Sequence, residues 1–215
     1  LNQHGVGDAA ASGGVEAVFD CHVVIDHLGG HLAAALVQQL GQAALVHRTD
    51  HFDATHIGLT CTAAPVFDSQ NRLRAVLDVS ALAPLPERQS QYGVLHLVQH
   101  FATLIETAAL MQAHRRHGLG RVGQAAAFLD VTPEFIIAVD DAGKIAGANH
   151  AFHQWAAQQL ELPERDLTGC LFEPLFGQSL LSVYSATRAK PAVLIGGRHL
   201  FASVSPPADQ HAAPP

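Results

Sequence analysis

The chain has 215 residues, of which 48% are hydrophobic and 14% are charged. This hydrophobic fraction excludes a disordered chain and is sufficient for one large domain or two small ones. The formal net charge is -7, and no run of Lys or Arg is longer than two residues. Nucleic-acid-binding modules carry a basic surface, so we expect this chain to make no direct contact with nucleic acid.

The cysteines Cys21, Cys61 and Cys170 are odd in number and form no CxxC motif. This usage is typical of a reducing compartment, and we expect a cytoplasmic protein. No uninterrupted apolar run reaches the roughly 18 residues of a membrane span, and no signal peptide is recognisable. We therefore expect no membrane segment. The start at Leu1 and the Pro-rich residues 206–215 suggest a piece of a longer protein with a flexible tail.

The first half predicts one small sheet with helices. Residues 1–22 are rich in Gly and Ala and predict a weakly structured segment before a domain at 23–114. Hydrophobic spacing predicts, in chain order, a strand at 23–25, a helix at 31–40 ended by Gly41, and strands at 43–47, 57–67 and 73–82. The last two strands flank a polar turn at 68–72 and so predict a hairpin.

A long helix is predicted from Gln89 to about His114, because apolar residues recur there at three- and four-residue steps. The predicted stripe comprises Val94, Val98, Phe101, Ile105 and Ala108, followed by Gln112 and widened by Leu97 and Leu104. A single domain needs a stripe only about 100° wide. We therefore expect the surplus width to pack against a second copy in a homodimer.

Gly118 and Gly120 are expected to interrupt the helical pattern. Residues 115–127 are expected to be a linker, and a second domain is predicted at 128–205. Its predicted elements are strands at 135–139 and 144–148 around an Asp/Gly turn, a helix through Leu160 capped by Asn149, and a last hairpin at 193–195 and 200–204. The whole is an α+β chain with two antiparallel sheets flanked by helices, joined by the long helix.

The first half resembles the GAF-like sensor of AcoR-type, sigma-54-dependent transcriptional activators, the acetoin catabolism regulators. The matching blocks are His51-Phe52, residues 58–68 (GLTCTAAPVFD) and residues 73–80 (LRAVLDVS), in the family's order and spacing. One block departs from the family. Residues 28–34 read LGGHLAA, where a Thr-Asn pair is usual, which predicts a partial or degenerate GAF-like domain.

The second half resembles a PAS domain. Residues 135–145 (FIIAVDDAGKI) and Asn149 have the usual order of strand, Asp/Gly turn, strand and helix start, and residues 167–176 fit the region after that helix. A GAF-like unit followed by a PAS unit is the order expected of the sensory region in this family. The family's ATPase and DNA-binding domains have no counterpart here, because the chain lacks the G-x-x-x-x-G-K-[ST] loop and a readable helix-turn-helix.

The resemblance implies a sensor that binds a small-molecule effector, acetoin or a related ketone or alcohol, and controls transcription through the missing domains. We expect no catalysis, because the chain has no phosphate loop, no G-x-S-x-G motif and no other catalytic motif, and we expect no cofactor. The candidate ligand-binding residues, taken from the matching blocks, are His51, Phe52, Cys61, Thr62, Asp78, Phe135 and Asn149. Asp78 has two readings, a solvent-facing strand residue, which is the default, or a hydrogen-bonding group in a pocket.

Two other functions stay open. One is a signal-blind dimerisation module that has lost its ligand. The other is a metal- or thiol-dependent enzyme using His51 and Cys61, with His47 and His56 as further candidate zinc ligands. The spacing of these residues is looser than in zinc motifs, and an apolar strand opposes formation of a thiolate. His96 and His100 are four residues apart on the long helix, but no HExxH motif surrounds them.

Overall fold

The computed structural model describes residues 19–24, 32–82, 87–159, 167–177, 179, 193–195, 198–205 and 207. Its helices and strands are β1 (Phe19–Val24), α1 (Leu32–Leu40), β2 (Ala44–His47), β3 (Thr60–Phe67), β4 (Leu73–Ala81), α2 (Tyr92–Ala113), β5 (Gly118–Gly123), β6 (Phe135–Val139), β7 (Ile145–Ala148), α3 (His150–Gln159), α4 (Phe172–Phe176), β8 (Val193–Ile195) and β9 (Arg198–Ser205). Short 3-10 turns lie at Arg48–Asp50, Arg88–Gln91 and Ala126–Phe128. Of the predicted weakly structured segment 1–22, residues 1–18 fall outside the described residues, as do the altered block at 28–34 up to His31 and most of the Pro-rich tail. Residues 19–22 were predicted wrongly, because they belong to β1, which begins four residues before the predicted strand at 23–25 and is paired along its length with β4.

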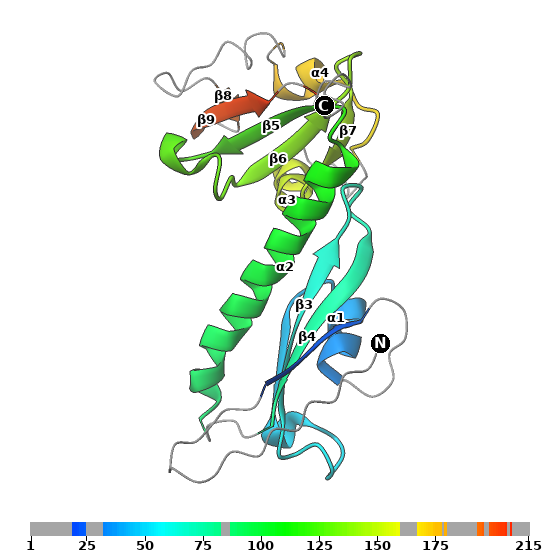
Figure 1. The fold of residues 1–215 in the computed structure, drawn as a ribbon, viewed down its shortest axis with the longest axis vertical. Coiled ribbons are helices and arrows are strands. Elements are labelled where there is room, and N and C mark those ends of the chain that lie inside the picture. The colour runs from blue at the N-terminus through cyan, green and yellow to red at the C-terminus, as the bar shows by residue number, and fades with distance from the viewer. Residues whose placement is uncertain are drawn as a thin grey trace, which may run out of the picture.

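Two antiparallel sheets form the framework. Within the described residues the first has the strand order β1-β4-β3-β2 and the second β7-β6-β5-β9-β8. Helix α2 runs along the first sheet and reaches the second with its C-terminal end (Figure 1). The predicted α+β architecture of two sheets joined by a long helix is confirmed.

The β3–β4 hairpin is the longest pairing in the first sheet, running from Thr60 opposite Ala81 to Phe67 opposite Leu73. Its turn is closed by Asp68, whose Oδ1 accepts hydrogen bonds from the backbone N–H groups of Gln70 and Arg72. This is the side-chain turn chemistry that the Asp-rich segment predicted. The strand begins three residues later than predicted, because His56 and Leu59 close a turn before it.

Each face of the first sheet carries one helix. Small residues of β3 alternate between the faces, so both helices can approach the sheet closely. On one face Ala33, Ala34 and Val37 of α1 pack on Val46, Cys61, Ala63 and Val76. On the other face Val98 and Ala102 of α2 pack on Ala64, Val66 and Leu77.

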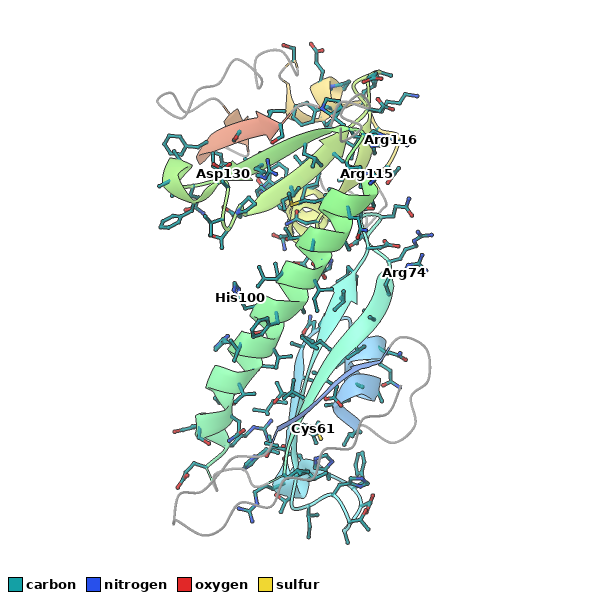
Figure 2. The ribbon with its side chains drawn as sticks, viewed as in Figure 1. Cys61, Arg74, His100, Arg115, Arg116 and Asp130 are labelled. Carbon is teal, nitrogen blue, oxygen red and sulfur yellow. The ribbon has the colours of Figure 1, made fainter. Side chains whose placement is uncertain are left out.

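The buried face of α2 differs from the predicted stripe. It consists of Val98, Ala102, Glu106 and Leu110. Leu97, Phe101, Leu104 and Ile105 are instead 41–53% exposed. The prediction ranked positions by hydrophobicity alone. The face that packs on the sheet instead has the small Ala102 at its centre and Glu106, whose carboxyl group accepts a hydrogen bond from a backbone N–H of the sheet. These four large apolar side chains of α2 therefore lie away from the sheet, and His100 also points away from it (Figure 2).

The segment Arg88–Ala113 is also long and apolar enough to span a membrane by length and composition alone. The sequence-based expectation missed this, because it counted only uninterrupted apolar residues. Within α2, Tyr92–Ala113, Glu106 is the single charged side chain. One face of the helix is covered by the sheet, as in the core helix of a globular domain.

The second sheet corrects the expected linker at 115–127. Residues Gly118–Gly123 form β5, which is hydrogen-bonded to β6 on one side and β9 on the other. Glycine disfavours strands, but pairing on both edges outweighs that preference. An added Cβ at Gly123 would lie 3.4 Å from Leu129 and 3.5 Å from the backbone nitrogen of Glu134, so a small residue suits this close approach.

The faces of the second sheet are covered by two helices. The end of α2 packs Leu110 against Leu119, Ile136 and Ala138. On the other face Phe152 of α3 belongs to the core that contains Phe135 and Ile137. Helix α2 therefore contributes to the hydrophobic core of both sheets.

The turn of the β3–β4 hairpin docks against the second sheet. The backbone N–H of Ala148 donates to the carbonyl of Ser69 over 2.9 Å, and the Ser69 hydroxyl lies 2.9 Å from Nε2 of His114. Gly147 permits this approach, since an added Cβ would lie 2.8 Å from Cβ of Ser69 and 2.5 Å from Nε2 of His114.

We expect Gly147→Ala to lower the free energy of unfolding by about 1–3 kcal/mol, because the hairpin turn must move to admit the methyl group. Gly93→Ala is the control, since nothing lies within 4 Å of its added Cβ and alanine favours the helix. Urea denaturation of both variants and the wild type measures the difference. An unchanged midpoint for Gly147→Ala would contradict the docking geometry.

Candidate functional site

The sequence-predicted residues of the first sheet lie on both of its faces. Cys61 is in the cluster that packs on α1, and Asp78, opposite Ala63 in the β3–β4 register, shares that face. Thr62 is adjacent to Cys61 in β3 and therefore points to the α2 face. The structure thus does not bring Thr62 together with Cys61 and Asp78, and their ligand-binding role stays a prediction.

The thiol of Cys61 is 2% exposed, and its Sγ lies 3.3 Å from Oγ of Ser80. Burial raises the pKa of this thiol, the hydrogen bond with Ser80 lowers it, and the nearby Asp78 raises it again. Asp78 is 0% exposed, so the default prediction that it faces solvent is wrong. It lies at an inner strand, with β1 and β3 paired on its two sides, where no edge faces water.

His51 and Phe52 follow the 3-10 turn at Arg48–Asp50, outside the sheet. The ring of Phe52 is 94% exposed, and the ring of His51 lies 6.0 Å from that of His56. His47 is buried and its Nδ1 lies 2.7 Å from Oγ1 of Thr60. Among the described residues, no group of three or more His, Cys, Asp or Glu side chains is arranged to hold a metal ion.

Phe135 and Asn149 have structural roles in the second sheet. The ring of Phe135 lies in the core, 5.5 Å from the ring of Trp155 and 5.9 Å from that of Phe152. Asn149 caps α3 as predicted, since its Oδ1 accepts from the backbone N–H groups of Phe152 and Ile136. Its Nδ2 donates to the carbonyl of Glu134. Both amide atoms of Asn149 are therefore used by the backbone.

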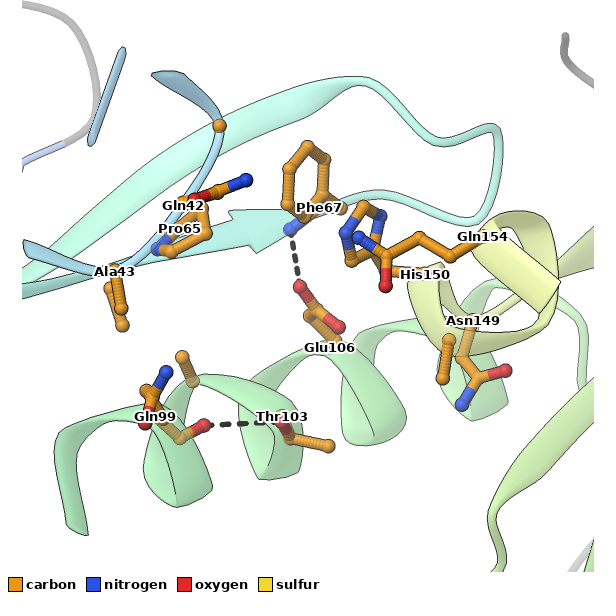
Figure 3. Close-up of a pocket in the computed structure, with 14 residues that line it drawn as sticks. Gln42, Ala43, Pro65, Phe67, Gln99, Thr103, Glu106, Asn149, His150 and Gln154 are labelled. Carbon is orange, nitrogen blue, oxygen red and sulfur yellow. Dashed lines mark hydrogen bonds between the residues drawn. The ribbon is translucent and has the colours of Figure 1, made fainter. Parts of the chain in front are cut away.

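A cavity of about 450 Å³ lies between the two sheets. Its walls come from the segment after α1, the end of β3, the middle of α2 and the start of α3, so residues far apart in the sequence meet there (Figure 3). The lining residues are Gly41, Gln42, Ala43, Ala64, Pro65, Phe67, Gln99, Ala102, Thr103, Glu106, Asn149, His150, Ala151 and Gln154. The volume is within the range of roughly 300–1,000 Å³ that is typical of small-molecule sites.

Glu106 is the buried carboxyl group of this cavity. It reaches from α2 toward β3, where its Oε1 accepts a 2.7 Å hydrogen bond from the backbone N–H of Phe67 (Figure 3). The side chain is 9% exposed. Burial raises its pKa to about 7, and the hydrogen bond from Phe67 opposes that rise. At neutral pH the carboxyl group therefore exchanges between its charged and neutral forms.

His150 forms the wall opposite α2. Its ring stacks on Phe67 with a centroid distance of 3.8 Å and an interplanar angle of 6°, and its Nδ1 lies 2.6 Å from Oδ1 of Asn71. Burial, and after it the neighbouring His153, lowers the pKa of His150 to about 4. The imidazole is therefore neutral at pH 7, and it joins α3 to the β3–β4 hairpin by stacking and hydrogen bonding.

Sequence reasoning found Asn149 but missed Glu106, Phe67 and His150 as cavity residues. One signal was present for Glu106, which is the single charged residue in the 22 residues of α2. A lone carboxylate in an otherwise uncharged helix is costly to bury and suggests a specific role. No comparable signal marks His150, because its neighbours come from a hairpin about 80 residues earlier in the chain.

The raised pKa of Glu106 predicts a pH-dependent stability. Glu106 binds its proton more tightly in the folded state, so its stabilising contribution is complete below pH 4.5 and is lost as the pH rises to about 7. The loss amounts to at most about 3 kcal/mol. Glu106→Gln keeps an oxygen for the Phe67 N–H and should remove this loss.

We expect the stability of Glu106→Gln, relative to wild type, to increase between pH 5 and pH 8, with the exposed Glu87→Gln as the control. Urea denaturation at several pH values measures both differences. A Glu106→Gln difference that stays constant across this range would contradict the assignment of a buried, titrating carboxyl group.

The sequence and the structure of this chain were compared with those of known proteins. No family model matches the chain. The chain is 40% identical over 193 residues to the Acetoin catabolism regulatory protein of Cupriavidus necator, an alignment that covers 86% of this chain and 29% of that protein. A chain in the crystal structure of the E. coli DhaR(N)-DhaL complex matches with a TM-score of 0.25 and 19% identity, over 71% of this chain and 50% of that one. The resemblance to the acetoin catabolism regulators, predicted from the motifs, is confirmed by the first of these alignments.

Proposed function

We propose that this chain is the small-molecule-sensing region of a bacterial transcriptional activator. The single observation that carries the proposal is its 40% identity, over 86% of its length, to a protein whose name describes regulation of acetoin catabolism. The chain spans 29% of that relative. In the proposal, ATPase and DNA-binding domains of a longer, cytoplasmic, sigma-54-dependent activator carry out the response, and this chain itself contacts no nucleic acid.

The arrangement of α2 supports a sensing role. This helix packs Val98 and Ala102 on the first sheet and Leu110 on the second. A molecule that binds beside α2 and favours one arrangement of the two sheets would shift the population toward that arrangement. The proposed signal is acetoin or a related small ketone or alcohol, after the name of the relative.

The enzyme hypothesis receives less support. Cys61 is buried and its pKa is raised, which disfavours the thiolate that a nucleophile requires. The relative is named as a regulatory protein rather than as an enzyme. A sensor accounts for both observations with no catalytic residue.

We expect acetoin or 2,3-butanediol to raise the melting temperature of the purified chain. A ligand present at 100 times its dissociation constant stabilises the folded state by about 2.7 kcal/mol. Differential scanning fluorimetry across a concentration series measures the effect, with buffer alone as the control. No shift with either ligand would count against these signals.

The signal-blind dimerisation module is favoured by one specific observation, the exposed apolar face of α2. Leu97, Phe101, Leu104 and Ala108 recur at four- and three-residue steps, and the large side chains among them are 41–53% exposed. This spacing is that of a coiled-coil seam, which is complementary to itself. We propose a second copy of this chain as its partner, because the face carries no charge that would repel an identical helix. Dimerisation is compatible with sensing.

Leu97→Glu or Leu104→Glu should weaken dimerisation at least about tenfold, since the carboxylate would be buried against the partner. Both positions are exposed in the single chain, so each variant should keep its fold. His96→Glu is the control, because His96 is exposed and lies beside the apolar seam. Sedimentation velocity measures association. A wild type that stays monomeric at high micromolar concentration, or variants that unfold, would contradict the proposal.

A further inference from the structure

We infer that the cavity between α2, β3 and α3 binds an uncharged molecule with a carbonyl or hydroxyl oxygen, and that Glu106 is the group that donates a hydrogen bond to it. This inference rests on the proposed function and gives the sensing role a site. It differs from the sequence-based candidates, of which Asn149 alone lines the cavity.

The geometry orients one oxygen of Glu106 toward a ligand. Oε1 is held by the backbone N–H of Phe67 at 2.7 Å. Among the described residues, no hydrogen bond is formed by Oε2 of the same carboxyl group. Figure 3 shows this side chain between the Ala43–Pro65 side of the cavity and the α3 side with His150 and Gln154. A bound molecule in this space would therefore meet Oε2.

The charges of the lining exclude an anion. Of the described residues around the cavity, none is Lys or Arg, and Glu106 and His150 are the two that titrate. His150 is neutral at pH 7 because burial and His153 lower its pKa to about 4. A carboxylate or phosphate ligand would thus be buried beside Glu106 without a compensating cation, which is costly.

An uncharged oxygen acceptor fits the same lining. With a pKa of about 7, Glu106 is substantially protonated at neutral pH, and its O–H can donate to a ligand oxygen. The side-chain amides of Gln42, Gln99 and Gln154 offer further donors and acceptors, while Ala43 and Pro65 supply apolar surface. A few polar groups set in an apolar wall is the usual composition of a small-molecule site.

The position of the cavity links binding to the arrangement of the sheets. Gln99 and Glu106 belong to α2, whereas His150 and Gln154 belong to α3. A ligand that contacts both helices binds more tightly when the hairpin turn is docked on the second sheet. Occupancy would therefore favour the docked arrangement.

The test measures binding by isothermal titration calorimetry with three probes of similar size. These are acetoin, which is uncharged, pyruvate, which is anionic, and 1-amino-2-propanol, which is cationic at neutral pH. We expect acetoin to bind most tightly. Because the pKa of Glu106 is about 7, its neutral form predominates at pH 6 and is the minor form at pH 8, so acetoin affinity should drop about tenfold between these values.

Three variants locate the site. Glu106→Gln retains a neutral donor and should bind acetoin with no such pH dependence. Glu106→Leu should lose at least tenfold in affinity. Gln154→Trp should block the cavity from an exposed position, which leaves the core intact. Gln158→Trp is the control, since Gln158 is exposed on the same helix and does not line the cavity.

The outcomes distinguish a wrong binding site from a wrong sensing function. Acetoin binding that Glu106→Leu and Gln154→Trp leave unchanged overturns this site but leaves the sensing function in place. Tighter binding of pyruvate or of the amine overturns the uncharged ligand class. If none of the three probes binds the wild type, both this inference and the proposed acetoin-like signal are wrong.

Discussion

The contact between the β3–β4 turn and β7 determines how the two sheets sit relative to each other. A short backbone hydrogen bond joins Ala148 to Ser69, and Gly147 leaves room for the turn beneath His114. The stack of His150 on Phe67 continues the same contact toward α2. Without this docking, α3 would not form a wall of the cavity. The site therefore depends on a turn that itself contributes no lining residue.

The burial of Glu106 against the first sheet is unfavourable in itself and is therefore informative. A carboxyl group taken out of water disfavours its charged form, and one backbone N–H recovers only part of the lost hydration. An apolar residue at this position of α2 would pack on the sheet without that penalty. The chain retains the carboxyl group where the helix meets a hollow space, which is why we connect it with ligand binding.

Much of the fold could be predicted from local patterns. The Asp68 turn predicted the hairpin, and Asn149 predicted the start of α3, because both residues act on backbone groups a few positions away. The strand Gly118–Gly123 was missed, since its stability comes from two partners far away in the sequence. The face of α2 was misassigned for a related reason. Hydrophobicity alone ranks Phe101 above Ala102, but the fit against Ala64 and Val66 decides which one is buried.

The candidate site was less predictable than the fold. Its lining comes from four separate segments, and nothing local in Gln42, Phe67 or His150 indicates that they meet. The resemblance pointed instead to Cys61, Thr62 and Asp78, which lie on opposite faces of one sheet. Motifs of this kind mark the residues that build a sheet, and a cavity at a junction arises only when two such units are placed together.

The length of α2 has a mechanical consequence. Its 22 residues span about 33 Å as one rigid rod, and the cavity lies near the middle of it. A rod held on one sheet near its start and on the other near its end acts as a lever. A tilt of about 5° at the middle would move its ends by more than 1 Å in opposite directions. A small molecule bound beside Glu106 therefore contacts α2 at a position where a small tilt of the helix changes its packing on both sheets.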